Sequence, residues 1–87
     1  MVLNLGGNRI GDAGAVALAG ALPQMPALED FDIQGNEIGD AGAVALAGAL
    51  PHMPALKYIN IRKNNIGVAA VDSFKQVAQA RGVGFYV

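Results

Sequence analysis

The residues of this chain that could do chemistry are few, and the most suggestive are two aspartates, Asp30 and Asp32. Their spacing of two places both carboxylates on one face of a strand, where they could hold a cation. Two carboxylates fall short of the about six to eight oxygen ligands that Ca²⁺ takes, and no EF-hand pattern surrounds them. The pair therefore predicts at most weak cation binding.

The sequence lacks the residues that common catalytic and metal sites need. The chain has one histidine, His52, and no cysteine, so neither a histidine-based triad nor a thiolate zinc site has its ligands. Residues 6–8 lack the spacing and the lysine of a phosphate-binding loop, and their glycines favour a tight turn. We expect no catalytic residue, no metal and no cofactor, and we expect that the protein is not an enzyme.

Length and composition describe one small domain. The chain has 87 residues, of which 53% are hydrophobic and 15% charged, and its net charge is -1. The absence of cysteine and a start unlike a signal peptide predict a cytoplasmic protein. The longest uncharged stretches, residues 13–28 and 41–56, are shorter than the ~20 residues of a membrane span. With 6 basic and 7 acidic residues, we expect neither a membrane nor a nucleic-acid partner.

The elements that must position these residues come from a repeat of 28 residues. Residues 10–23 and 38–51 both read IGDAGAVALAGALP, and 20 of the 28 positions of residues 8–35 are identical in residues 36–63. A third unit opens at residue 64 with NNIG and then diverges. A fixed period of about 20 to 50 residues is typical of stacked repeats. We expect a single domain, residues 1–87, with a partial unit 1–7 and units 8–35, 36–63 and 64–87.

Each unit contains a strand pattern followed by a helix pattern. Apolar residues alternate with polar ones before each unit's asparagine, as at Phe31 and Ile33, which predicts strands with one buried face. An apolar stripe at spacings of three and four then predicts helices that Pro23 and Pro51 end. A third helix is expected over residues 69–80, strands are expected to begin again at residues 28 and 56, and a last strand is expected over residues 83–87.

The pattern of the second unit resembles the leucine-rich repeat family. That repeat reads L-x-x-L-x-L-x-x-N-x-L before a helix, and the matching residues here are Leu28, Phe31, Ile33, Asn36, Ile38, Gly42, Leu46 and Leu50. The G-D-A-G block and the period resemble the ribonuclease-inhibitor-like subclass, also seen in Ran GTPase-activating protein and NOD-like receptors. The resemblance implies an α/β solenoid of about three 28-residue repeats, with parallel strands on the concave face, helices on the convex face and protein binding as the usual function. Vertebrate ribonuclease inhibitors are long and cysteine-rich, whereas this chain has about three repeats and no cysteine. So short an array cannot wrap a partner as a full horseshoe does.

Two sets of polar residues have predicted structural roles. Asn8, Asn36 and Asn64 occupy equivalent places, and an asparagine at a turn can satisfy backbone groups left unpaired as the strand bends away. We expect their side chains to form a ladder. Asp12 and Asp40 come just before the helix patterns, so we expect each to be the N-cap of its own helix.

The residues that alternate with the buried strand positions form the candidate binding surface. Stacked copies set Tyr58 beside Asp30 and Arg62 beside Gln34, and Tyr86 joins them if Phe85 takes the place of Ile59. The predicted surface consists of Asp30, Asp32, Gln34, Tyr58, Asn60, Arg62, Lys63 and Tyr86. Tyrosine and arginine dominate interface energetics, so a protein contact surface is one interpretation. A solvated face without a partner is the other.

Charge is unevenly spread along the chain. Residues 1–50 hold one basic and six acidic residues, whereas residues 51–87 hold five basic and one acidic residue. In a solenoid, distance along the sequence is distance in space, so one end is expected to be acidic and the other basic. This polarity could align molecules or steer a charged partner, or it could be a solvated surface without consequence.

The N-terminal flank has no polar capping unit, although a solenoid needs one. An open sheet edge invites another chain, so we expect a homodimer or larger assembly. The candidate contact residues are Val2, Leu3, Leu5, Val16 and Ala17. Two functions follow: a non-catalytic protein–protein interaction module whose partner the sequence does not identify, or a minimal, truncated or engineered array whose main property is self-association.

Overall fold

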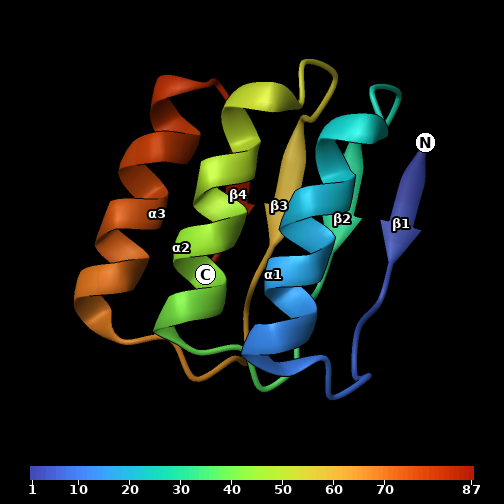
Figure 1. Ribbon diagram of the computed structural model, residues 1–87. Coiled ribbons are helices and arrows are strands. Elements are labelled where there is room, and N and C mark those ends of the chain that lie inside the picture. The colour runs from blue at the N-terminus through green and yellow to red at the C-terminus, as the bar shows by residue number, and fades with distance from the viewer.

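The computed structural model describes residues 1–87 and consists of four parallel strands and three helices. The strands are β1 (Val2–Asn4), β2 (Asp30–Asp32), β3 (Tyr58–Asn60) and β4 (Gly84–Tyr86), in the order β1-β2-β3-β4. The helices are α1 (Gly11–Ala21), α2 (Asp40–Ala49) and α3 (Val68–Ala80), and they lie side by side (Figure 1). This is the α/β arrangement of parallel strands and helices that the sequence predicts.

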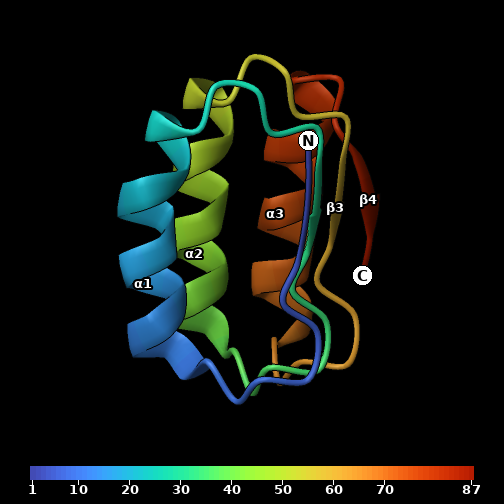
Figure 2. The same ribbon diagram turned by 90° about the vertical axis from the view of Figure 1, so that its right-hand side faces the viewer.

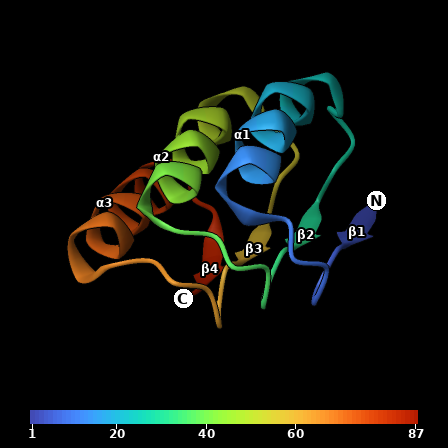
Figure 3. The same ribbon diagram turned by 60° about the horizontal axis from the view of Figure 1, so that its bottom comes forward.

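Helices cover one face of the sheet and leave the other free. Figure 2 shows the helices in one layer and the strands in a second layer. Figure 3 shows that helices and strands follow the same order across the two layers. We call the uncovered face of the four strands the open sheet face. No helix has the length and apolarity that a membrane crossing requires.

The strand register stacks equivalent residues of the sequence copies. Asp30 pairs with Tyr58, and Phe85 pairs with Ile59. Because Phe85 takes the place of Ile59 in the last strand, Tyr86 joins the predicted surface and lies beside Asn60. The strands are shorter than expected, because Leu28 and Leu56 lie in the turns before β2 and β3. The N–H groups of these two leucines donate to the carbonyls of Met25 and Met53, at 3.0 and 3.2 Å.

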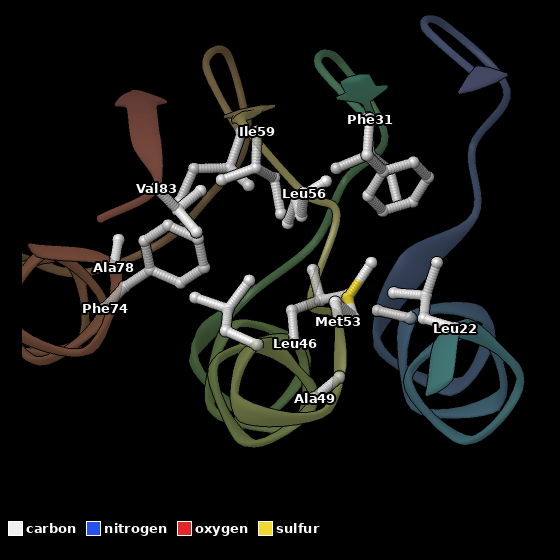
Figure 4. Close-up of a cluster of buried hydrophobic side chains, with 14 of the residues drawn as sticks. Leu22, Phe31, Leu46, Ala49, Met53, Leu56, Ile59, Phe74, Ala78 and Val83 are labelled. Atoms are coloured by element: carbon white, nitrogen blue, oxygen red, sulfur yellow. The ribbon is translucent and has the colours of Figure 1, made fainter. Parts of the chain in front are cut away.

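The core lies between the two layers (Figure 4). Phe31 and Ile59 point from the strands toward the helices, Phe31 on the side of Leu22 and Ile59 nearer to Phe74, and these side chains are fully buried together with Leu46. Burying such side chains contributes about 1.5–3 kcal/mol each. This apolar layer fixes which strand residues point inward and which reach the open sheet face.

Proline determines how the helices end. Helices α1 and α2 stop at Ala21 and Ala49, and each continues into a 3₁₀ turn that contains a proline, Leu22–Gln24 and Leu50–His52. Helix α3 has no such proline and runs on to Ala80. Gly82 follows the C-cap Arg81 with a φ of 68° that suits glycine, and Val83 N–H donates back to Ala78 O at 2.9 Å. This is a Schellman end.

Helix α3 stands farther from α2 than α1 does. A methyl group at Gly42 would lie 3.0 Å from Ala15 Cβ and 2.8 Å from Asp12 Oδ1, so α1 and α2 approach closely only because the residue is glycine. The equivalent residue of α3 is Ala70, which has a methyl group where α2 has only a hydrogen atom and which lines the space between the two helices. An apolar groove of about 350 Å³ opens between them, bordered by Val44, Phe74 and Val77 among others.

Candidate functional site

A ladder of asparagine side chains holds the turns that follow the strands. Asn36 is fully buried, and its Oδ1 accepts from the backbone N–H groups of Asn8 and Ile10 at 2.8 and 3.3 Å. Asn64 Oδ1 accepts in the same way from Asn36 and Ile38, at 2.9 and 3.0 Å. The three side chains therefore have the structural role expected of them, and their amides face backbone carbonyls rather than a ligand.

Asp12 and Asp40 do not cap their own helices, so that prediction was wrong. Asp12 already lies in the first turn of α1, and its Oδ1 accepts instead from the N–H groups of Gly39 and Gly42 at the start of α2, at 2.7 and 3.0 Å. Asp40 likewise accepts from Gly67 N–H, at 2.7 Å, at the start of α3. Each aspartate therefore caps the next helix, which satisfies two of the free N–H groups at the start of α2 and one at the start of α3 and ties neighbouring copies together.

The strands end in a second recurring hydrogen bond. Asn4, Asp32 and Asn60 occupy equivalent positions, and the Oδ1 atom of each accepts from the backbone N–H two residues on, at 3.0 Å. Asparagine and aspartate favour this local turn. Part of the polar capacity of Asp32 and Asn60, both predicted for the binding surface, is therefore used inside the chain.

The open sheet face carries a shallow hollow of about 200 Å³ over the strands. Five predicted surface residues line it: Asp30, Asp32, Tyr58, Asn60 and Tyr86. Val2 and Asn4 line it too, although Val2 was expected in the self-association surface. The 28-residue period was the sequence signal for this placement, since it sets Val2 beside Asp30 and Asn4 beside Asp32.

Gln34, Arg62 and Lys63 lie beyond the strand ends and do not line the hollow. Lys63 has a φ of 57°, in the left-handed region. Its equivalents, Gly7 and Gly35, adopt similar angles of 73° and 65°. The structure thus splits the predicted surface into an acidic and aromatic hollow and a neighbouring basic rim.

Two tyrosines form the aromatic part of the hollow. The rings of Tyr58 and Tyr86 stack with centroids 6.5 Å apart and planes 26° apart. Tyr58 lies over Gly84, where an added Cβ would come within 2.6 Å of the Tyr58 ring. The side chains remain 49% and 52% exposed, so each offers ring surface to solvent.

The acidic residues at the site differ in how their charge is balanced. Glu29 faces the Lys57 ammonium at 3.5 Å and the Met1 amine at 3.4 Å, and these cations lower the pKa of Glu29. No cation of the chain forms an ion pair with Asp30 or Asp32. The hollow therefore carries two carboxylates without a counter-charge beside two exposed aromatic rings.

Two segments of the chain match a known family of proteins. Residues 1–19 and 24–47 match the family model described as Leucine Rich repeat. The chain belongs to the leucine-rich repeat family. The matched segments contain β1, β2, most of α1 and the first part of α2, so the leucine-rich repeat pattern covers the Asn8–Asn36 step of the ladder. No curated protein matches the sequence.

The first unit of this leucine-rich repeat chain has an incomplete core. Leu3, Leu5 and Leu18 are only half-buried, whereas their equivalents Phe31, Ile33 and Leu46 are fully buried. The difference arises because β1 is an edge strand and nothing packs against the free side of α1. Of the other predicted contact residues, Ala17 is exposed on α1, and Val2 and Val16 are 67% and 52% exposed.

Helix geometry separates Val16 from this free side. Its equivalent on α2, Val44, borders the groove toward α3, so Val16 projects on the side of α2. Residue Ala17 lies about 100° farther round the helix, toward the free flank. The flank surface is therefore formed by Leu3, Leu5 and Ala17, with Leu18 behind them.

The structure brings no catalytic set together. His52 is exposed in the turn after α2, and no group of three or more His, Cys, Asp or Glu side chains could hold a metal ion. The groove between α2 and α3 was not predicted, although the change from Gly42 to Ala70 was its signal in the sequence. Among its lining residues only Ser73 has a polar side chain, so the groove offers little chemistry.

Proposed function

We propose that this leucine-rich repeat chain is a non-catalytic protein-interaction module that binds a protein partner through its open sheet face. Leucine-rich repeat domains generally bind other proteins, and the family match supports the same role here. We further propose a short solenoid of about three repeats of the ribonuclease-inhibitor-like subclass, with the open sheet face as its concave side. The proposal includes a cytoplasmic location and excludes cofactors and nucleic-acid or membrane partners.

The observation that carries this proposal is the stacked pair Tyr58 and Tyr86 in the hollow. Each ring is about half exposed, and tyrosine suits interfaces because it combines an apolar ring with a polar hydroxyl group. Tyrosine is enriched in the buried centre of protein interfaces. Arg62, exposed on the rim, adds a second residue type that dominates binding energies.

Selection of binding peptides tests the proposal. A displayed library of random peptides would be selected on the wild-type protein, and the affinities of the selected peptides measured for Tyr58→Ala/Arg62→Ala. A matched control, Val68→Ala/Arg81→Ala, changes an exposed apolar and an exposed basic residue at the two ends of α3. We expect about a tenfold loss for the first variant and less than about twofold for the control. Equal affinities for the first variant and the wild type would refute the proposal.

A second candidate function is self-association through the N-terminal flank. The observation that favours it is the half-buried state of Leu3, Leu5 and Leu18, whose equivalents are completely buried. A second copy placed against the flank would remove this apolar surface from water, which is favourable. The edge of β1 would also gain hydrogen bonds for its free backbone groups.

Light scattering behind a sizing column tests self-association across a wide range of protein concentration. The variant Ala17→Glu places a charge on the flank, and Ala13→Glu makes the same change at another exposed position of α1. We expect the wild type and Ala13→Glu to form dimers or larger species, and Ala17→Glu to be a folded monomer. A monomeric wild type at all concentrations would refute this candidate.

A further inference from the structure

We propose that the hollow on the open sheet face binds a basic side chain, best an arginine, presented by an extended segment of the partner protein. This inference rests on the proposed interaction function and adds the chemistry of the partner. It combines the size of the hollow, the uncompensated charge of Asp30 and Asp32, and the exposed ring of Tyr58.

The size of the hollow suits one side chain. Pockets for small-molecule ligands usually measure about 300–1,000 Å³, and this hollow measures about 200 Å³ and is open to solvent. A cofactor or drug-sized ligand would protrude from it. A single long side chain of a peptide that lies across β2 and β3 would fill it.

The charge of the hollow exceeds what the fold needs. Asp32 makes its turn hydrogen bond at the strand end, but Asn4 and Asn60 make the same bond with a neutral amide. The second carboxylate oxygen of Asp32 has only a long contact of 3.4 Å from the Gln34 amide. The negative charge at this position is therefore free to attract a ligand.

The carboxylate of Asp30 has fewer partners in the chain than that of Asp32. The Asp30 carboxylate takes part in no side-chain hydrogen bond and no ion pair of the structure, whereas its neighbour Glu29 is paired with Lys57. Two like charges at a spacing of two on one strand face lie about 7 Å apart and repel each other. A cation between or above them would relieve that repulsion.

The tyrosines select the kind of cation. Tyr58 is the register partner of Asp30, and both residues line the hollow, in which the Tyr58 ring leans over Gly84 of β4. A guanidinium group stacks on an aromatic ring and donates two parallel hydrogen bonds to a carboxylate. Lysine would gain the charge attraction but not this paired geometry, and Ca²⁺ would find too few oxygen ligands.

The remaining charges set the limits of the site. Arg62 and Lys63 lie on the rim past the ends of the strands and would repel a second basic residue placed there. The partner segment is therefore expected to carry its arginine over β2 and β3, and neutral or acidic residues toward Arg62. A uniformly basic partner would fit less well.

Fluorescence anisotropy with a defined probe tests this inference. The probe is a labelled peptide of three Gly-Ser-Arg repeats, and its control carries citrulline, a neutral residue of the same shape, in place of each arginine. Both are measured against wild type, Asp30→Asn/Asp32→Asn and Asp72→Asn, which neutralises an exposed acid on α3. Circular dichroism checks that each variant keeps its fold.

We expect the arginine peptide to bind wild type at least about tenfold more tightly than the citrulline peptide. Asp30→Asn/Asp32→Asn should remove that preference, Asp72→Asn should keep it within about twofold, and added salt should weaken it. Equal binding of the two peptides, no binding of either, or an unchanged preference in Asp30→Asn/Asp32→Asn would overturn the inference.

The selected peptides separate this inference from the interaction proposal. If they lose affinity for Tyr58→Ala/Arg62→Ala but not for Asp30→Asn/Asp32→Asn, the open sheet face binds proteins without recognising a basic side chain. In that case only the arginine inference fails. If they bind Tyr58→Ala/Arg62→Ala as they bind wild type, the proposed function fails as well.

Discussion

Replacement of Asn36 by alanine tests the asparagine ladder, and its cost can be worked out group by group. The Asn36 amide donates to the carbonyls of Leu5, Ile33 and Gln34. Each of these carbonyls keeps another donor after the substitution: Asn8 Nδ2 for Leu5, Asn64 Nδ2 for Ile33 and Gly7 N–H for Gln34. The carbonyls therefore contribute little to the loss.

The two donors to Asn36 Oδ1 have no such substitute. The N–H groups of Asn8 and Ile10 make no other hydrogen bond in the structure. An orphaned polar group costs about 1–3 kcal/mol, and less where water reaches it. We expect Asn36→Ala to lower the free energy of unfolding by about 3 kcal/mol, which is a large part of the about 5–15 kcal/mol typical of a domain.

Urea unfolding followed by circular dichroism measures this loss, with Asn8→Ala as the matched control. Asn8 is exposed, its Oδ1 accepts nothing from the chain, and one of its two acceptors, Leu5 O, keeps the Asn36 donor. We expect Asn8→Ala to cost less than about 1 kcal/mol. The midpoint of Asn36→Ala should fall by about 1–3 M urea at an unchanged slope, since the slope for small proteins is about 1–3 kcal/mol per M urea. Losses that agree within about 0.5 kcal/mol would refute the ladder's energetic role.

Three further predictions concern packing, capping and backbone strain. Asp12→Ala should cost about 1–2 kcal/mol because two N–H groups of α2 lose their acceptor, and Asp40→Ala should cost less because it frees one; urea unfolding that reversed this order would contradict the shared caps. Gly42→Ala should destabilise by about 1–3 kcal/mol because its methyl group meets Ile38 at 2.5 Å and α1 at 2.8 and 3.0 Å, whereas Gly48→Ala in the same helix meets nothing and should stabilise by up to about 1 kcal/mol; thermal unfolding with both changes of the same sign would speak against the close packing around Gly42. Lys63→Gly should raise stability by about 0.5–1 kcal/mol because the left-handed φ of 57° suits glycine, and a lower melting temperature for this variant would show that the strain is absent.

Much of the fold could be predicted because two copies of the sequence carry the same pattern of strand, turn and helix residues. The period of 28 placed Asn36 and Asn64 in one ladder and Asp30 beside Tyr58, and the structure has both arrangements. The third unit could also be placed, because Phe85 supplies the apolar residue that pairs with Ile59. These features depend on local patterns that repeat along the chain.

The features that sequence reasoning missed depend on contacts between copies. Asp12 has the right spacing to cap its own helix, but α1 begins at Gly11, and the carboxylate then reaches the amides of α2 instead. The groove beside α3 is lined in part by Ala70, at a position where α2 has Gly42. In both cases the outcome depends on the distance between neighbouring helices, which no single unit specifies.

The central claim, that the open sheet face is the binding surface, is tested most directly by mapping a selected peptide on the protein with ¹H–¹⁵N chemical shifts. We predict that the backbone amides whose shifts change on binding cluster in β2, β3 and β4, around Asp30, Tyr58 and Tyr86. Shifts confined to α1, α2 and α3, with the strands unchanged, would contradict the claim and place the binding surface on the helices.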